Sequence, residues 1–435
     1  MTISEKYKGK MIKKVSNTGI PKEEHNALLN QIDENKNKLY GLMKDNGYDV
    51  NDNMNIDELV GLLESVGLGI GNIKQIACGL DHTMVITNDG SLWACGYNNK
   101  GQLGLGNTTN QSTFTQVTTN INNDVKYVAC GFYHTMILKN DGTVWGTGYG
   151  YPLGVGSSNN KTTFTQVTAN INNDVKDISC GDYHTMILKT DGTLWAAGSN
   201  NKGSLGTGGS NSQTTFKQIN TSNVKQVICR GHNTYYVKTT GGFYACGDNE
   251  YGQLGIGSTD TDSHTSFTKT ASDVKEIACG KNFVFVTKND NTIWACGSSW
   301  YGELGLNMSS MSFTSFNQVT TNISDVKKIY CTHEGGTFML KNDGTLWACG
   351  INSYGQLGNN ADIGNSNYWL IFKQITTSSK IKDIICGRHH VFVIKEDNSI
   401  WMTGYNIYGQ LGNSSTSNIA TFSPANMPSS SGTKF

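Results

Sequence analysis

The chain of 435 residues contains only four prolines and has no net charge, because 34 basic residues balance 34 acidic ones. A neutral chain lacks the global field that would draw it onto nucleic acid or an acidic membrane. It also lacks an apolar run of 18 or more residues, so we expect no membrane insertion. The lysine-rich first 20 residues are not followed by the apolar core of a secretory signal, so we expect synthesis in the cytoplasm without a signal peptide.

Cysteine pairs with metal-type spacing are also missing. The sequence has 11 cysteines but no C-x-x-C pair, and such pairs are typical of zinc and redox sites. Without a secretion signal, a disulfide framework is not expected either. We therefore predict reduced, unbridged thiols, no metal site and no cofactor.

Glycine is abundant, with 51 residues, and it accompanies an internal repeat. The segment IACGLDHTMVI around Cys78 recurs in seven related copies that lie 49 to 55 residues apart. This period falls in the range of propellers and solenoids. The repeated position is occupied by Cys78, Cys130, Cys180, Cys229, Cys279, Cys331 and Cys386.

Each copy continues with a turn, an aromatic strand, a glycine-rich loop and a further strand, as in NDGSLWACG followed by NNKGQLG. The Asp-Gly pair between two apolar runs predicts a tight hairpin, because such a turn needs positive φ. Four strands in a copy are typical of one propeller blade. The sequence thus predicts an all-β fold, a seven-bladed β-propeller, and we expect the strand at 422–427 to close the ring beside the first strand at 73–78.

Residues that recur in register are expected to hold the blades together. The cysteine sites are predicted to be small and buried, the histidines to hydrogen-bond at blade turns, and the tryptophans to pack between neighbouring blades. These structural positions are Cys78, Cys130, Cys180, His82, His134, His184, His390, Trp93, Trp145, Trp195, Trp294, Trp347 and Trp401. No catalytic residue is predicted.

The motifs CGxxHT, DGxLWxxG and NxxGQLG recur together and in order, and this combination resembles the repeat of the regulator-of-chromosome-condensation family. The resemblance covers about residues 73–427 and implies a seven-bladed propeller. The sequence departs from the pattern locally, since copy four has Tyr244 in place of tryptophan and copies four to six lack the histidine. The resemblance makes an intracellular regulator, acting by nucleotide exchange or protein binding, one candidate function.

Aromatic residues outside the consensus are the predicted binding residues. Similar blades can specialise only where they differ, and variable turns framed by constant residues are free to do so. Trp300 is out of register, and Tyr368 with Trp369 falls in the longest predicted insertion, residues 359–372. The predicted binding residues are Phe132, Tyr133, Tyr183, Trp300, Tyr368 and Trp369.

Residues 1–70 are predicted to form a small α-helical module ahead of the propeller at 71–435. Pro21 opens a first amphipathic stretch, and Asn55 with Glu58 predicts the start of a second helix ending at Gly67. The first helix is compatible both with packing inside this module and with an oligomeric coiled coil. Residues 38–66 also resemble linker modules of phage tail and tail-like bacteriocin proteins.

These features favour a non-enzymatic recognition protein. The leading hypothesis is a component of a phage tail or tail-like particle, found in the virion or particle. Its residues 1–70 would bind a particle or tail protein, and its propeller loops would contact a cell-surface target; nucleic acid is not an expected partner. The alternatives are the intracellular regulator named above and a propeller enzyme that acts on carbohydrate, for which paired carboxylates outside the repeat would be the mark.

Overall fold

The computed structural model describes residues 73–320, 323–359 and 367–428. The chain divides into two units, Met1–Ile70 with Thr433–Phe435, and Gly71–Gly432. The predicted helices of residues 1–70 lie outside the described residues. No helix within the described ranges has the length and apolar character needed to cross a membrane.

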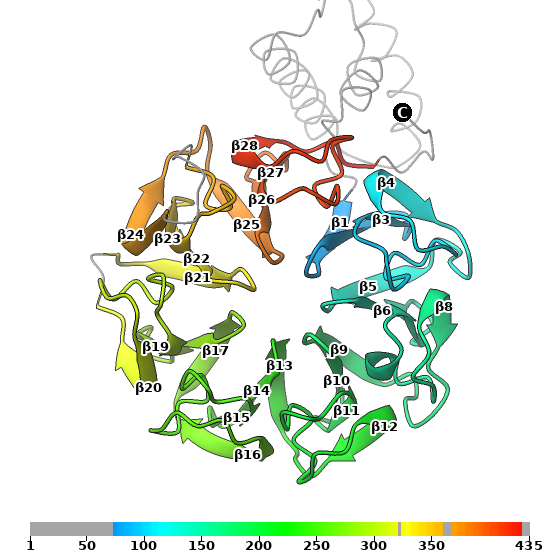
Figure 1. Cartoon of the computed structure of the whole chain (residues 1–435), viewed down its shortest axis with the longest axis horizontal. Coiled ribbons are helices and arrows are strands. Elements are labelled where there is room, and N and C mark those ends of the chain that lie inside the picture. The colour runs from blue at the N-terminus through cyan, green and yellow to red at the C-terminus, as the bar shows by residue number, and fades with distance from the viewer. Residues whose placement is uncertain (1–72, 321–322, 360–366, 429–435) are drawn as a thin grey trace, which may run out of the picture. The chain divides into compact units, whose positions relative to one another are not determined.

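Seven four-stranded sheets are arranged around a central axis (Figure 1), which confirms the predicted seven-bladed propeller. Blade 1 contains β1 (Ile73–Cys78), β2 (His82–Thr87), β3 (Leu92–Gly96) and β4 (Gln111–Val117). Blade 2 contains β5 (Val125–Cys130), β6 (His134–Lys139), β7 (Val144–Gly148), the short helix η1 (Tyr151–Leu153) and β8 (Lys161–Gln166). Blade 3 contains β9 (Val175–Cys180), β10 (His184–Lys189), β11 (Leu194–Gly198) and β12 (Gln213–Ile219).

The remaining blades repeat this order. Blade 4 contains β13 (Val224–Arg230), β14 (Asn233–Lys238), β15 (Phe243–Gly247) and β16 (His264–Ala271). Blade 5 contains β17 (Val274–Cys279), β18 (Phe283–Lys288), β19 (Ile293–Ser298) and β20 (Ser312–Gln318). Blade 6 contains β21 (Val326–Cys331), β22 (Gly336–Lys341), β23 (Leu346–Ile351) and β24 (Tyr368–Ile375). Blade 7 contains β25 (Ile381–Cys386), β26 (His390–Lys395), β27 (Ile400–Gly404) and β28 (Ile419–Pro424).

Each blade is an antiparallel meander in which the first strand is innermost. The second strand is buried along its whole length in blades 1 to 3, whereas the fourth strand is largely half-buried or exposed. The hairpin between the second and third strands turns on a glycine such as Gly90, whose φ of 82° is costly for other residues. The predicted Asp-Gly turns thus lie where the chain reverses.

The hydrophobic core is divided among the junctions between neighbouring blades. At the junction of blades 7 and 1, Val85 and Trp93 pack in one cluster with Phe392 and Met402. Each of the other five in-register tryptophans packs against the cluster between its own blade and the preceding one. Burial of large side chains at these junctions therefore stabilises the ring as a whole.

The prediction that a C-terminal strand closes the ring is wrong. The last strand, β28, pairs with β27 of its own blade, and β1 pairs with β2. The array begins on an innermost strand and ends on an outermost one, so each blade consists of four consecutive strands. No strand from the end of the array therefore completes the first blade. Ala425 and Met427 contribute to closure by packing in the cluster that contains Ile76.

The predicted insertion at 359–372 is also shorter than expected. Tyr368 and Trp369 belong to strand β24, where they are paired with Ile351 and Gly350 of β23. The run YWLIF is rich in residues that favour strands, and pairing with β23 satisfies the backbone groups on that side of the strand. Two of the predicted loop aromatics are therefore strand residues.

Candidate functional site

Two sets of connections share one face of the propeller, which we call the turn face. In a four-stranded meander, the connection from strand one to strand two and the connection from strand three to strand four lie at the same edge. The turns of successive blades are linked around the ring. Leu80 N donates to Gly131 O at 3.3 Å, His333 N to Gly387 O at 2.9 Å, and Arg388 N to Leu80 O at 3.2 Å. These bonds fix the turns against one another.

Aromatic rings form a nearly continuous path over this face, which we call the aromatic arc. Tyr97 lies 4.5 Å from Tyr408 of blade 7 and 6.0 Å from Tyr133 of blade 2, measured between ring centroids. The path passes through six of the seven blades and leaves out blade 5. Its members are Tyr97, Phe132, Tyr133, Tyr149, Tyr183, His232, Tyr354, His389, Tyr405 and Tyr408.

The predicted binding residues fall into two groups. Phe132, Tyr133 and Tyr183 come together in the arc, where the rings of Phe132 and Tyr183 stack at 5.4 Å. The second group lies on blades 5 and 6. Trp300 is 49% exposed in the loop of blade 5, and the ring of Tyr368 lies 5.9 Å from that of Tyr301. Trp369 lies under Lys373, whose Nζ is 4.9 Å from its ring.

Several members of the arc were missed by the sequence argument. Tyr97, Tyr149 and Tyr405 directly follow the glycine that ends the third strand, and Tyr354 and Tyr408 precede the GQLG loop. The signal was available, because the position after that glycine differs between copies as the turn positions do.

An ion-pair system lies near the axis of the turn face. His333 Nε2 of blade 6 is 2.6 Å from Asp182 Oδ1 of blade 3, so the contact spans the ring. Glu334 Oε1 lies 3.0 Å from Arg388 Nε, and Glu334 Oε2 lies 3.2 Å from His389 Nε2. Burial alone raises the pKa of Glu334, but the hydrogen bond with His389 and the charge of Arg388 lower it overall. These pairs compensate the charges that the fold buries there.

The in-register histidines link adjacent blades. Thr135 Oγ1 donates to Gln102 O at 2.8 Å, so His82 Nε2, 3.0 Å from the same hydroxyl, must be the donor of the second bond. The same bond joins His134 to Thr185 and His184 to Thr234. Burial lowers the pKa of each of these histidines to about 3, so they are neutral at pH 7.

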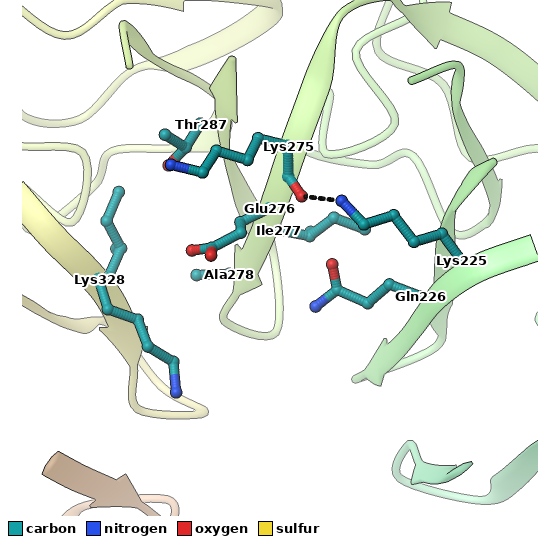
Figure 2. A pocket seen from close by; sticks show the side chains of 9 residues that line it. Lys225, Gln226, Lys275, Glu276, Ile277, Ala278, Thr287 and Lys328 are labelled. Carbon is teal, nitrogen blue, oxygen red and sulfur yellow. Dashed lines mark hydrogen bonds between the residues drawn. The ribbon is translucent and has the colours of Figure 1, made fainter. Parts of the chain in front are cut away.

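Lysines lie near the start of each innermost strand, at the end of the strand that is away from the turn face. The second residue of every first strand is an exposed lysine, and β21 has another at its third residue. The sequence shows this as a repeated Val-Lys or Ile-Lys pair, which the sequence analysis did not include among its candidates. Lys225 Nζ donates to Lys275 O of the next blade at 3.2 Å, as Figure 2 shows beside a cavity of about 370 Å³. Lys74 reaches Val125 O in the same way at 3.3 Å. These lysines serve as links between blades.

The cysteines offer no reactive centre among the described residues. All 11 are free, nine are buried, and burial raises the pKa of Cys78 and of Cys229 to about 12. Thiols in that state are poor nucleophiles and poor metal ligands. Within the described ranges, no group of three or more His, Cys, Asp or Glu side chains is arranged to hold a metal ion.

Comparisons with known proteins agree with this architecture. The family model of the RCC1-like domain matches residues 35–272, more than half of the chain, and the model of the regulator of chromosome condensation (RCC1) repeat matches residues 343–394. A secretion-regulating guanine nucleotide exchange factor of Bos taurus is 42% identical over 78 residues, which is 18% of this chain and 17% of that protein. The chain thus matches about one sixth of the length of that curated relative.

Solved structures share the fold over a longer range. Human WBSCR16 superimposes with a TM-score of 0.67 and 20% identity, covering 78% of this chain and 94% of that one. Prp20p from Saccharomyces cerevisiae superimposes with a TM-score of 0.64 and 16% identity, covering 72% and 80%. The repeat, the blade architecture and the matched model together show that this chain belongs to the RCC1-like domain family.

Proposed function

We propose that this protein is a regulator of the RCC1 type that binds a partner protein on its turn face. The observation that carries the proposal is the aromatic arc. Its rings come from six blades, its tyrosines are partly exposed, and most of these tyrosines occupy positions that the repeat leaves variable. Tyrosine supplies a large contact area at low entropic cost and is enriched in protein interfaces.

The relatives support a protein partner. One is named as a guanine nucleotide exchange factor, and Prp20p is described as having binding properties to Gsp1p and histones. Action on a guanine-nucleotide-binding protein is therefore our first candidate activity. The relatives support this interpretation over the tail-particle interpretation, whose main evidence was the pattern of residues 38–66.

The arrangement of the face fits binding rather than covalent chemistry. Its buried charges are held in the Asp182–His333 pair and in the contacts of Glu334 with Arg388 and His389. A general acid or base must instead be free to exchange a proton with a substrate. We therefore assign the turn face a recognition role.

The test measures binding of the full chain to purified guanine-nucleotide-binding proteins and to purified histones. Tyr183→Ala and Tyr405→Ala remove arc rings from two different blades, and Ile371→Ala removes an exposed side chain on the outer strand β24. We expect each tyrosine variant to weaken binding of a captured partner about 10-fold or more, the usual effect at an interface hot spot, and the isoleucine variant to leave it unchanged.

Nucleotide release from each captured partner is then followed with a fluorescent guanine nucleotide. Faster release with the wild-type protein, lost in Tyr183→Ala, supports exchange activity. Binding that none of the arc substitutions alters would show that the partner uses another surface and would overturn the proposal.

A further inference from the structure

Blade 5 interrupts the aromatic arc, and a cavity of about 430 Å³ lies there between blades 5 and 6. Its walls include Trp300, Tyr301, Glu303, Glu334 and Gly335. Trp300 and Tyr301 are 49% and 42% exposed, whereas Glu303 is only 5% exposed. A buried carboxylate and two accessible aromatic rings thus line the same cavity.

Glu303 occupies a position that glutamine holds in four of the other blades, at Gln102, Gln253, Gln356 and Gln410. The side-chain oxygen does the same work in both cases. Glu303 Oε2 accepts from Tyr301 N at 2.7 Å, and Gln356 Oε1 accepts from Tyr354 N at 2.9 Å. The turn is therefore satisfied by a neutral amide, and the loop geometry does not require a negative charge.

The other end of the side chain differs. Gln410 Nε2 donates to Asp81 Oδ1 of the next blade at 3.4 Å, and Gln356 Nε2 lies 3.3 Å from His389 Nδ1. The residue that corresponds to Asp81 and His389 in blade 6 is Gly335, which has no side chain. A Cβ placed on Gly335 would lie 3.2 Å from Glu303 Cγ, so the glycine lets the Glu303 side chain lie close against the backbone and offers it no polar side-chain partner.

Among the residues that the structure describes, Glu303 lacks the positive partner that the neighbouring ionisable groups have. Glu334 is paired with Arg388 and His389, and His333 is paired with Asp182. Lys281, also in the cavity wall, lies near enough to Asp182 to lower the pKa of that carboxyl. Within the described ranges the carboxylate of Glu303 accepts from neutral donors, the backbone N–H groups of Tyr301 and Glu303 and the hydroxyl of Ser298, and burial raises its pKa.

We propose that this cavity binds a lysine or arginine side chain of the protein partner, with Glu303 as the counter-charge and Trp300 and Tyr301 packing against the cation. A buried carboxylate without a positive partner is unfavourable, and a guanidinium or ammonium group relieves that cost by pairing with it. Accessible aromatic faces add cation–π attraction. The inference rests on the proposed function for the identity of the ligand as part of a protein, and it names the residue type recognised.

The test uses the full chain and small probes, so that it does not depend on finding the partner. The protein is labelled with 5-fluorotryptophan, and the fluorine resonance of Trp300 is identified with a Trp300→Phe variant. N-acetyl-arginine methylamide is titrated against the matched neutral probe N-acetyl-citrulline methylamide. We expect the Trp300 resonance to shift in a saturable way with arginine and to shift at least fivefold less with citrulline.

Glu303→Gln is the decisive variant, because glutamine at this position is accommodated by four other blades. We expect it to abolish the arginine-dependent shift. Glu250→Gln removes the same charge from the corresponding loop of blade 4, outside the cavity wall, and should leave the titration within twofold of the wild type.

Equal responses to arginine and citrulline, or an unchanged titration in Glu303→Gln, would overturn the inference. Partner binding that survives in Glu303→Gln while Tyr183→Ala abolishes it would leave the proposed function intact and remove only this inference. An arginine-specific shift in a protein that binds none of the purified partners would support the cation site and contradict the proposed function.

Discussion

His390 Nε2 of the last blade lies 3.2 Å from Thr83 Oγ1 of the first blade, across a sequence separation of 307 residues. Thr83 Oγ1 also donates to Gln410 O at 2.7 Å. The same hydroxyl therefore joins the two ends of the array through two bonds. The histidine–threonine hydrogen bond that links adjacent blades inside the ring also links the last blade to the first. At that junction the two blades share no strand.

Thr83→Val should destabilise the propeller by about 2 kcal/mol, because it removes both bonds and leaves a buried ring nitrogen without an acceptor. Thr337→Val is the matched control, since Thr337 Oγ1 donates to Glu303 O at 2.7 Å and the preceding blade carries Phe283 at the position of the histidine. Its cost should be smaller. Equal shifts of the denaturant midpoint in the two variants would contradict a role for the His390 bond in closure.

Acid should destabilise the propeller through its buried histidines. Their pKa is lowered by burial to about 3 in the folded protein, against 6.5 when exposed. The stability they contribute is complete above pH 6.5 and is lost as pH falls from 6.5 toward 3, by about 1.4 kcal/mol per pH unit for each histidine.

His134→Asn introduces the residue that blade 4 carries at this position as Asn233. We expect it to lower stability at pH 7 and to reduce the slope of stability against pH between 6 and 4. Urea melts over that range measure both effects. A slope identical to that of the wild type would show that His134 does not resist protonation as its burial implies.

Glu303→Gln should raise the thermal midpoint at pH 7, because it removes a buried carboxylate that has no positive partner in the described part of the chain. Burial raises the pKa of Glu303 in the folded protein, so its ionisation opposes folding at high pH, and this cost declines as pH falls from the raised pKa toward the ordinary pKa of a glutamate. The gain from the substitution should therefore shrink in acid. Melting curves at pH 7 and pH 5 check the sign, and a lower midpoint for Glu303→Gln at pH 7 would refute it.

Trp195→Ala should cost about 3 kcal/mol, since this ring packs at the junction of blades 2 and 3 and lies 4.7 Å below Lys189 Nζ. Tyr183→Ala, in the aromatic arc, should cost less than about 1 kcal/mol. Equilibrium denaturation compares the two variants. The distinction between blade-packing and recognition aromatics fails if Tyr183→Ala is the more damaging substitution.

The cysteines of the native protein should react slowly with a thiol reagent at pH 8. Nine are buried, and burial raises the pKa of both Cys78 and Cys229 to about 12. All 11 should react once the chain is unfolded in guanidinium chloride. Counting modified thiols by mass under both conditions checks this, and rapid modification of several thiols in the native state would contradict it.

The fold could be predicted from the repeat. Its seven copies predicted the number of blades, and the turn and glycine positions placed the hairpins, because these features depend on residues that are close together in the chain. The packing of Trp195 between blades also followed from its register. Within blade 6, the same local reasoning placed Tyr368 in a loop, since a sequence with an insertion does not mark where pairing with β23 resumes.

The sequence by itself determined that each copy makes a blade and which residues recur inside it. Only the tertiary structure decided which blades meet across the ring, as in the contact of Asp182 with His333, and how the last blade joins the first. The physical reason is that such contacts depend on the angle between successive blades summed around the whole circle. Periodicity reports what is equal in every copy, whereas the aromatic arc and the Glu303 cavity arise from residues that differ and are brought together by closure.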